Sequence, residues 1–122
     1  MRYLLIMQVR TAVLERLTQE QRQAVHTGHQ EFCRAAAEAG ELISTQALAD
    51  PSTSTILRGR GGVSAVSYGP FRATDEFMGG YYLIDVDSRE RAIELAELLP
   101  DARIDGLAVE IRAVMYSAGA DF

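Results

Sequence analysis

A short apolar run in the second half of the chain, Tyr81 to Val86, constrains the fold more than any other feature. It follows the glycine pair Gly79-Gly80 and lies beyond a Gly-Pro-Phe turn at 69–71. Glycine adopts backbone angles that other residues avoid, and proline fixes the entry to a turn. The run is too short for an isolated helix and is rich in aromatic and β-branched residues, which predicts a strand buried on both faces. Such a strand needs a layer of structure on each side.

The length and composition restrict the class of protein. With 122 residues, 48% of them hydrophobic, the chain is expected to form one domain around one core. The formal net charge of -5 argues against a nucleic-acid-binding protein, which usually carries a basic face. Cys33 is the only cysteine, which fits a reducing compartment, and no segment approaches the roughly 18 apolar residues of a membrane span. We therefore expect a cytoplasmic protein with neither nucleic-acid nor membrane partners.

In the first half of the chain a strand is followed by a long helix. The apolar residues 3–9 predict a first strand rather than a signal peptide. Thr18 followed by Gln21 has the capping-box pattern of a helix start. The helix is expected from Gln19 to Ala39, with Gly40 as its stop. Its apolar stripe comprises Val25, His29, Phe32, Ala36 and Ala39.

The second half predicts further strands and one more helix. The expected strands are 41–48, a hairpin of 54–58 and 63–67, then 81–86 and 107–115. A helix capped by Asp87 or Ser88 and ended by Pro100 would bury Ala92, Ile93, Ala96 and Leu99. Residues 1–116 are expected to form one domain and 117–122 a loose tail.

This order is the ferredoxin-like α+β arrangement βαββαβ with an extra hairpin. The first and third main strands, 3–9 and 81–86, are then central, in keeping with their apolar character. Two helices cover only one face of such a sheet, and an uncovered apolar face usually marks an interface. We therefore expect a homodimer packed sheet face to sheet face, which forms a dimeric α+β barrel.

Five blocks carry a family resemblance that spans nearly the whole chain. They are Tyr3-Leu4-Leu5-Ile6, His29-Gln30-Glu31-Phe32, Gly69-Pro70-Phe71-Arg72-Ala73-Thr74, Gly79-Gly80-Tyr81-Tyr82-Leu83-Ile84-Asp85-Val86 and Val109-Glu110-Ile111-Arg112-Ala113-Val114. In these blocks the chain resembles the YCII-related family, and within it the branch named for an Asp-Gly-Pro-Phe motif. The resemblance implies a dimeric α+β barrel of ferredoxin-like type.

The resemblance implies less about activity. Related proteins include a dehydrochlorinase of aromatic degradation, and a histidine–aspartate pair has been proposed as the family's active site. Some members are encoded beside extracytoplasmic-function sigma factors, which points to a regulatory context. His29 matches the family histidine, whereas Tyr68 stands where the motif has its aspartate. Tyr68 either replaces that aspartate or marks its loss.

His29 is the first candidate for a catalytic residue, as a general acid or base near neutral pH. The alternative is a buried histidine bonded to the backbone. Tyr68 is a second candidate, although a phenol with a pKa near 10 is a poor base, and the alternative is an aromatic residue packed beside the turn. Asp75, with Glu76, is a third candidate, as the source of the missing carboxylate. Asp85 is more simply explained by a structural pair with Arg112.

The turn residues and two arginines are expected to shape and line a pocket. The predicted pocket residues are Arg58, Gly69, Pro70, Phe71, Arg72, Gly79 and Gly80. Arg58 or Arg72 would hold a substrate carboxylate. A purely structural turn is the alternative for the glycines, the proline and the phenylalanine. No glycine-rich phosphate loop is present.

A metal site is not expected. His26, His29 and Cys33 lie near one helix face, but no second cluster completes a zinc site, and Cys33 is more simply a small buried thiol.

Three interpretations are consistent with the sequence, the last of which is a dimeric protein whose pocket is vestigial. The first is a small-molecule lyase or isomerase that uses His29 as acid or base, without a cofactor. The second is a non-catalytic ligand-binding or regulatory dimer.

Overall fold

The structure is a computed structural model, and it describes residues 1–119. It is a mixed α+β fold with antiparallel sheets, consistent with the predicted ferredoxin-like class. The elements in chain order are β1 (Arg2–Arg10), α1 (Thr11–Arg16), α2 (Gln19–Glu38), β2 (Leu42–Ala47), the 3-10 turn η1 (Pro51–Thr53), β3 (Thr55–Arg60), β4 (Val63–Tyr68), β5 (Glu76–Asp85), α3 (Arg89–Glu97), the 3-10 turn η2 (Pro100–Arg103) and β6 (Ala108–Ala113).

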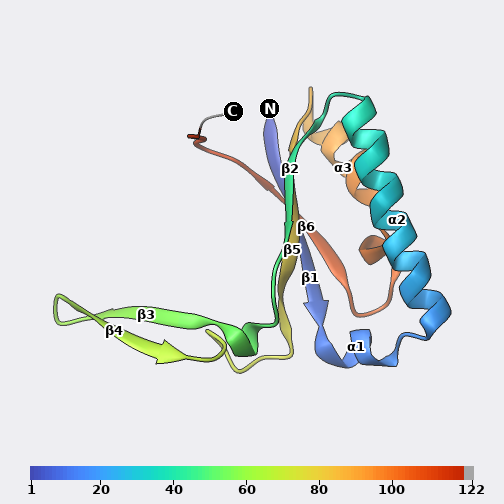
Figure 1. Cartoon of the computed structure of the whole chain (residues 1–122). Coiled ribbons are helices and arrows are strands. Elements are labelled where there is room, and N and C mark those ends of the chain that lie inside the picture. Colours follow the sequence, from blue (N-terminus) through green and yellow to red (C-terminus); the bar gives the residue numbers. More distant parts are fainter. Residues whose placement is uncertain (120–122) are drawn as a thin grey trace.

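The main sheet has the strand order β2-β5-β1-β6, and all its neighbours are antiparallel. Strands β1 and β5 are central, as predicted. Helices α2 and α3 both lie against one face of this sheet (Figure 1). The opposite face carries no helix, so the fold has two layers.

The core lies between the helices and the covered face of the sheet. It comprises Tyr3, Leu5, Met7 and Val9 of β1, Tyr82 and Ile84 of β5, Phe32 and Ala36 of α2, and Ala92, Leu95 and Ala96 of α3 with Leu99 beyond it. The predicted stripe of α2 is wrong at Ala39, which is exposed because the helix ends at Glu38. In α3 the prediction is wrong at Ile93, which is 39% exposed while Leu95 is buried in its place.

The helix boundaries follow from local hydrogen bonds. The capping box at α2 is confirmed, because Thr18 accepts from the backbone of Gln21 and the Gln21 side chain accepts from the backbone of Thr18. Of the two cap candidates for α3, Ser88 is the N-cap and accepts from the backbone N–H of Arg91. Helix α1, which follows β1 directly, has no side-chain cap and was not predicted.

The uncovered face of the main sheet is less exposed than predicted. Ile6 and Leu83, both on this face, are only 5% and 8% exposed. The predicted pair of Asp85 with Arg112 is wrong: Asp85 accepts from the N-terminal amine of Met1 at 3.1 Å, and Arg112 pairs with Glu110. The predicted loose tail, 117–122, lies only in part within the described residues.

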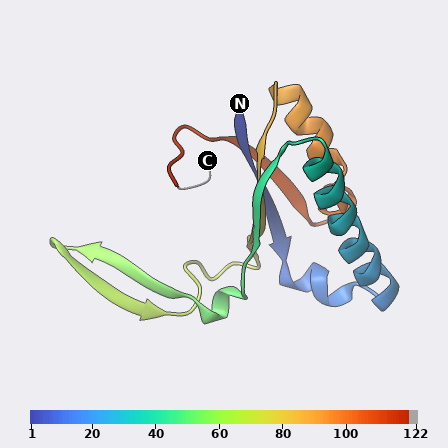
Figure 2. The ribbon, with the colours of Figure 1, turned by 45° about the horizontal axis from the view of Figure 1, so that its top comes forward.

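Strands β3 and β4 form a separate two-stranded sheet that leaves the body of the domain. It projects from the uncovered side of the main sheet, and Figure 2 shows the same arrangement after rotation. The turn at its tip contains Gly61 and Gly62 with φ of 58° and 82°, values in the left-handed region that favours glycine. We call residues 55–68 the arm.

Among residues 1–119, no helix is both long and apolar enough to cross a membrane.

A bidentate ion pair joins the start of β2 to α3. The guanidinium of Arg91 donates to Glu41 over distances of 2.7 to 3.2 Å, and this lowers the pKa of the Glu41 carboxyl. We expect Glu41→Gln to reduce the free energy of unfolding by about 1 kcal/mol at neutral pH. A lowered folded-state pKa stabilises the fold fully above the ordinary value of 4.5, and this contribution is lost as pH falls through the lowered pKa.

Urea unfolding at pH 7 and pH 3 measures this difference, with Glu97→Gln on the exposed side of α3 as the matched control. A Glu41→Gln penalty that is unchanged at pH 3 would contradict the ion-pair explanation.

Candidate functional site

His29 of α2 lies between two polar side chains, one at each ring nitrogen. Its Nδ1 is 2.7 Å from the hydroxyl of Tyr82, on the central strand β5. Its Nε2 is 2.7 Å from Oδ1 of Asp101, in the 3-10 turn η2. Asp101 is only 4% exposed, and His29 keeps about a quarter of its side chain accessible. We call these three residues the triad.

The chemistry of the partners fixes the hydrogen-bond directions. An ionised carboxylate only accepts hydrogen bonds, so Nε2 of His29 carries a proton and donates it to Asp101. In the neutral ring Nδ1 then has a lone pair, which accepts from the Tyr82 hydroxyl. A carboxylate in this position also stabilises the imidazolium that forms when His29 takes up a proton.

A close approach of two elements positions Asp101. Residue 28 of α2 is glycine, and a Cβ built there would lie 2.3 Å from Cγ of Pro100. Only a residue without a side chain lets Pro100 pack this tightly against the helix. Pro100 starts η2, and Asp101 follows it, so the contact brings the carboxylate to the helix beside His29.

Tyr82 is almost fully buried on the covered face of β5. Its ring is stacked with His29, with an interplanar angle of 11°, and tilted against Phe32, with ring centroids 4.5 Å apart. Burial is the main cause that raises the pKa of the Tyr82 hydroxyl, and Cys33 and the Asp101 carboxylate raise it further. Tyr82 is therefore held in its protonated, hydrogen-bond-donating form across the neutral range.

The triad lines a cavity of about 440 Å³ between the helical layer and the sheet edge at β2. Its apolar wall consists of Met7, Val9, Leu14 and Phe77, and its other side is formed by residues 45–48, Asp50, Gly79 and Gly80. A Cβ at Gly80 would lie 2.7 Å from the carbonyl oxygen of Gln46, so glycine allows β2 and β5 to approach here. Hydrogen bonds from Ser52 lower the pKa of Asp50, which keeps a negative charge at this cavity.

The structure separates the residues that the sequence suggested as catalytic. Tyr68 ends β4 and is 83% exposed on the arm. Asp75 is exposed in the loop before β5 and accepts a long hydrogen bond from the backbone of Ala12. Neither lines the cavity of His29, so His29 alone of the three candidates lies in the triad.

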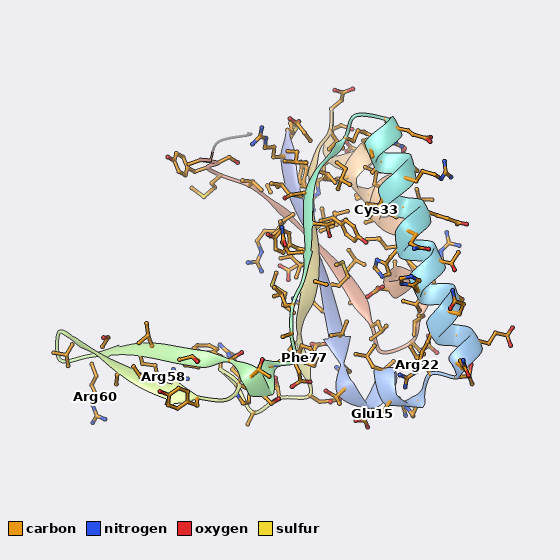
Figure 3. All side chains as sticks on the ribbon, viewed as in Figure 1. Glu15, Arg22, Cys33, Arg58, Arg60 and Phe77 are labelled. Carbon is orange, nitrogen blue, oxygen red and sulfur yellow. The ribbon has the colours of Figure 1, made fainter. Side chains whose placement is uncertain are left out.

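The predicted pocket residues divide between two cavities. Gly79 and Gly80 line the cavity of the triad. Pro70, Phe71 and Arg72 line a neighbouring cavity of about 520 Å³ at the base of the arm. Arg58 and Gly69 line neither of these two cavities; Arg58 lies on the arm, where its guanidinium covers the Phe71 ring. Phe77 contributes to both walls and lies where the arm joins the sheet (Figure 3).

Two residues of the triad were not predicted from the sequence. Asp101 follows Pro100 directly, and a proline followed by an acid is a signal for a new 3-10 turn as well as a helix stop. Tyr82 alternates with Tyr81 and Leu83, so it faces the helical layer whenever those two face away. The alternation along β5, together with the position of His29 on α2, could have predicted that Tyr82 and His29 face each other.

The described residues contain no group of three or more side chains suited to hold a metal ion, and His26 is exposed. What the triad can do with its own atoms is move a proton: the Tyr82 hydroxyl donates, the imidazole relays and the carboxylate stabilises the charged ring.

The Gly28–Pro100 contact can be tested by adding one methyl group. Alanine favours a helix by roughly 1 kcal/mol over glycine, yet we expect Gly28→Ala to destabilise the protein by about 1–3 kcal/mol because the methyl group displaces η2. Urea unfolding measures the change, with the exposed neighbour Gln30→Ala as the matched control. Stabilisation by Gly28→Ala would contradict the packing described.

The raised pKa of Tyr82 predicts a decline of stability in alkali. The unfolded tyrosine ionises near pH 10, so its contribution is fully present below about pH 10 and is lost as pH rises toward the higher folded-state pKa. In Tyr82→Phe the free energy of unfolding should fall less steeply between pH 9 and pH 11 than in the wild type. Tyr81→Phe, on the opposite face of β5, is the control. Equal slopes in the wild type and Tyr82→Phe would contradict the role of burial.

Two comparisons place the chain among known proteins. The model of the YCII-related domain matches residues 1–116. An uncharacterized protein, R00369 of Rhizobium meliloti (strain 1021), is 34% identical over 83 residues, which cover 67% of this chain and 67% of that protein. With a match over nearly its whole length, the chain belongs to the YCII-related family.

Proposed function

We propose that the protein is a small-molecule enzyme of the lyase or isomerase kind, which moves a proton with its triad. The observation that carries the proposal is the position of His29, held at both ring nitrogens at the wall of an apolar cavity. The His29–Asp101 pair supplies the histidine–aspartate combination that the sequence left incomplete at Tyr68. Asp101 takes the role for which Asp75 was suggested.

The occupied ring nitrogens determine how the proton travels. Since Nδ1 of His29 is bonded to Tyr82, the Tyr82 hydroxyl is the atom that meets the substrate. A substrate C–H proton passes to the Tyr82 oxygen while the Tyr82 proton passes to Nδ1, which leaves a carbanion or enolate on the substrate and an imidazolium beside Asp101. Return of a proton to another atom completes an isomerisation, and departure of a leaving group completes an elimination.

The cavity suits this chemistry in size and polarity. A volume of about 440 Å³ lies within the range of about 300–1,000 Å³ that holds small ligands. Its wall is mainly apolar and the Asp101 carboxylate is buried, which strengthens the attraction between that carboxylate and the imidazolium. The charge of Asp50 at the same cavity disfavours an anionic group beside it.

The second candidate function is a non-catalytic ligand-binding or regulatory protein. One observation favours it: within residues 1–119, every buried side-chain nitrogen and oxygen already has a hydrogen-bond partner. A triad whose atoms are satisfied by one another is also what a structural network would show. Binding without turnover would then depend on the cavity wall rather than on proton transfer.

Proton exchange at carbon tests the enzymatic proposal. We would follow deuterium incorporation by NMR for a panel of small, uncharged enolisable ketones in D₂O. The wild type should accelerate exchange of at least one compound, and His29→Gln and Asp101→Asn should reduce this rate by roughly 10²–10⁴-fold. His26→Gln, on the exposed side of α2, is the matched control and should leave the rate unchanged.

The same panel separates the two functions. A compound that binds to the wild type and to His29→Gln alike, without exchange in either, would contradict the enzyme and favour the binding protein. Loss of exchange in His29→Gln with retained binding supports the proton-transfer role.

A further inference from the structure

Two cavities adjoin at the place where the arm joins the main sheet. Leu48 and Phe77 line both the cavity of the triad, which we call the triad cavity, and the neighbouring cavity of about 520 Å³, which we call the arm-base cavity. The backbone N–H of Leu48 donates to the carbonyl oxygen of Gly79 at 2.9 Å, which holds the residue after β2 against β5. Phe77 packs against the core. A ligand longer than the triad cavity therefore extends into the arm-base cavity along these two side chains.

The charges that line the two cavities are of opposite sign. The triad cavity has the carboxylates of Asp50 and Asp101 and no arginine among its lining residues. The charged residues that line the arm-base cavity are Arg72 and Glu76. Glu76 accepts from Nε of Arg10 at 3.3 Å, so its negative charge is already offset. The arm-base cavity is therefore left with the positive charge of Arg72.

Arg72 is the one of the two suggested arginines that is suited to bind a carboxylate. Arg58 lines neither cavity, and its guanidinium is occupied by the carbonyl oxygen of Phe71 at 3.1 Å. Within residues 1–119, Arg72 makes no hydrogen bond or ion pair, and its guanidinium lies 5.8 Å from the centroid of the Phe71 ring. A guanidinium binds a carboxylate through two parallel hydrogen bonds. The Ser54 hydroxyl, which also makes no hydrogen bond within these residues, is a further donor in the same cavity.

The surface between these charged groups is apolar. Leu48 is 50% exposed and Phe71 is 54% exposed. Together with Pro51, Pro70 and Phe77 they line the arm-base cavity. Exposed apolar side chains gathered around a concave site indicate ligand binding, and a few polar groups then fix the orientation of the ligand. The middle of a ligand that crosses this surface is therefore apolar.

We propose that the two cavities together bind one elongated oxo acid, with its uncharged carbonyl end at the triad, its apolar chain along Leu48 and Phe77, and its carboxylate at Arg72. The position of the carbonyl end rests on the proposed function, whereas the position of the carboxylate rests on the charges of the two cavities. In this orientation the carboxylate lies in the cavity that Asp50 does not line. The second candidate function, binding without turnover, accommodates the same ligand.

NMR titration of the full chain with a series of methyl ketones tests the proposal. Each probe carries a carboxylate at the other end of an unbranched chain whose number of methylene groups is varied, and its primary amide is the uncharged match. Affinity should rise with chain length to an optimum and then fall. At the optimum the acid should bind about 10-fold more tightly than its amide. It should shift the backbone amide signals of Gly80 and Arg72, whereas a short uncharged ketone should shift only that of Gly80.

Arg72→Gln removes the charge that is expected to hold the carboxylate. It should reduce the affinity for the best acid by about 10-fold, to that of the amide, and leave the affinity for the amide unchanged. The matched control, Arg60→Gln, removes an arginine from the far end of the arm, away from both cavities, and should change neither affinity (Figure 3). Both arginines are exposed, and circular dichroism confirms that each variant is folded.

Failure of this ligand class and failure of the enzyme give different results. Exchange of uncharged ketones, with acids that bind no more tightly than their amides, would overturn the ligand class and leave the enzyme in place. Acids that bind through Arg72 without exchange would support the ligand class and contradict the enzyme. The ligand class would also be overturned if no acid binds, or if Arg72→Gln binds the best acid as tightly as Arg60→Gln does.

Discussion

The contact between Gly28 and Pro100 is the constraint on which the site depends. It brings a 3-10 turn that follows α3 against the middle of α2, and it does so only because residue 28 has no side chain. The Asp101 carboxylate is thereby buried beside His29, where a charge without a partner would be costly. The other ring nitrogen of His29, Nδ1, is bonded to the Tyr82 hydroxyl on the sheet, so the contact of the Pro100 ring with Gly28 organises all three residues.

Much of the fold could be predicted from the sequence because local signals agreed with one another. The capping box of Thr18 and Gln21 fixed the start of α2, and the two most apolar runs became the central strands. Ala39 and Asp85 were misjudged since each depends on where a neighbouring segment ends or on a distant terminus. Of the triad, only His29 was predicted. Asp101 lies 72 positions away in the sequence and contacts His29 only in the folded structure.

The arm and the triad lie on opposite sides of the main sheet and have different chemical surroundings. The triad lies at the wall of a mainly apolar cavity, which the helical layer and one face of the sheet form together. The arm places exposed uncharged side chains and arginines on the other side of the sheet. The Gly-Pro-Phe turn lies between them: its Phe71 ring is held by Arg58 from the arm and lines the cavity next to that of the triad.

The tautomer of His29 shows directly whether Asp101 and Tyr82 hold the ring in the orientation described. Long-range ¹H–¹⁵N correlation NMR of the wild type at neutral pH reports which ring nitrogen carries the proton. We expect a protonated Nε2 bonded to Asp101 and an unprotonated Nδ1, with this pattern lost in Asp101→Asn. A protonated Nδ1 in the neutral ring, or a spectrum that Asp101→Asn leaves unchanged, would contradict the triad as the organising feature of the site.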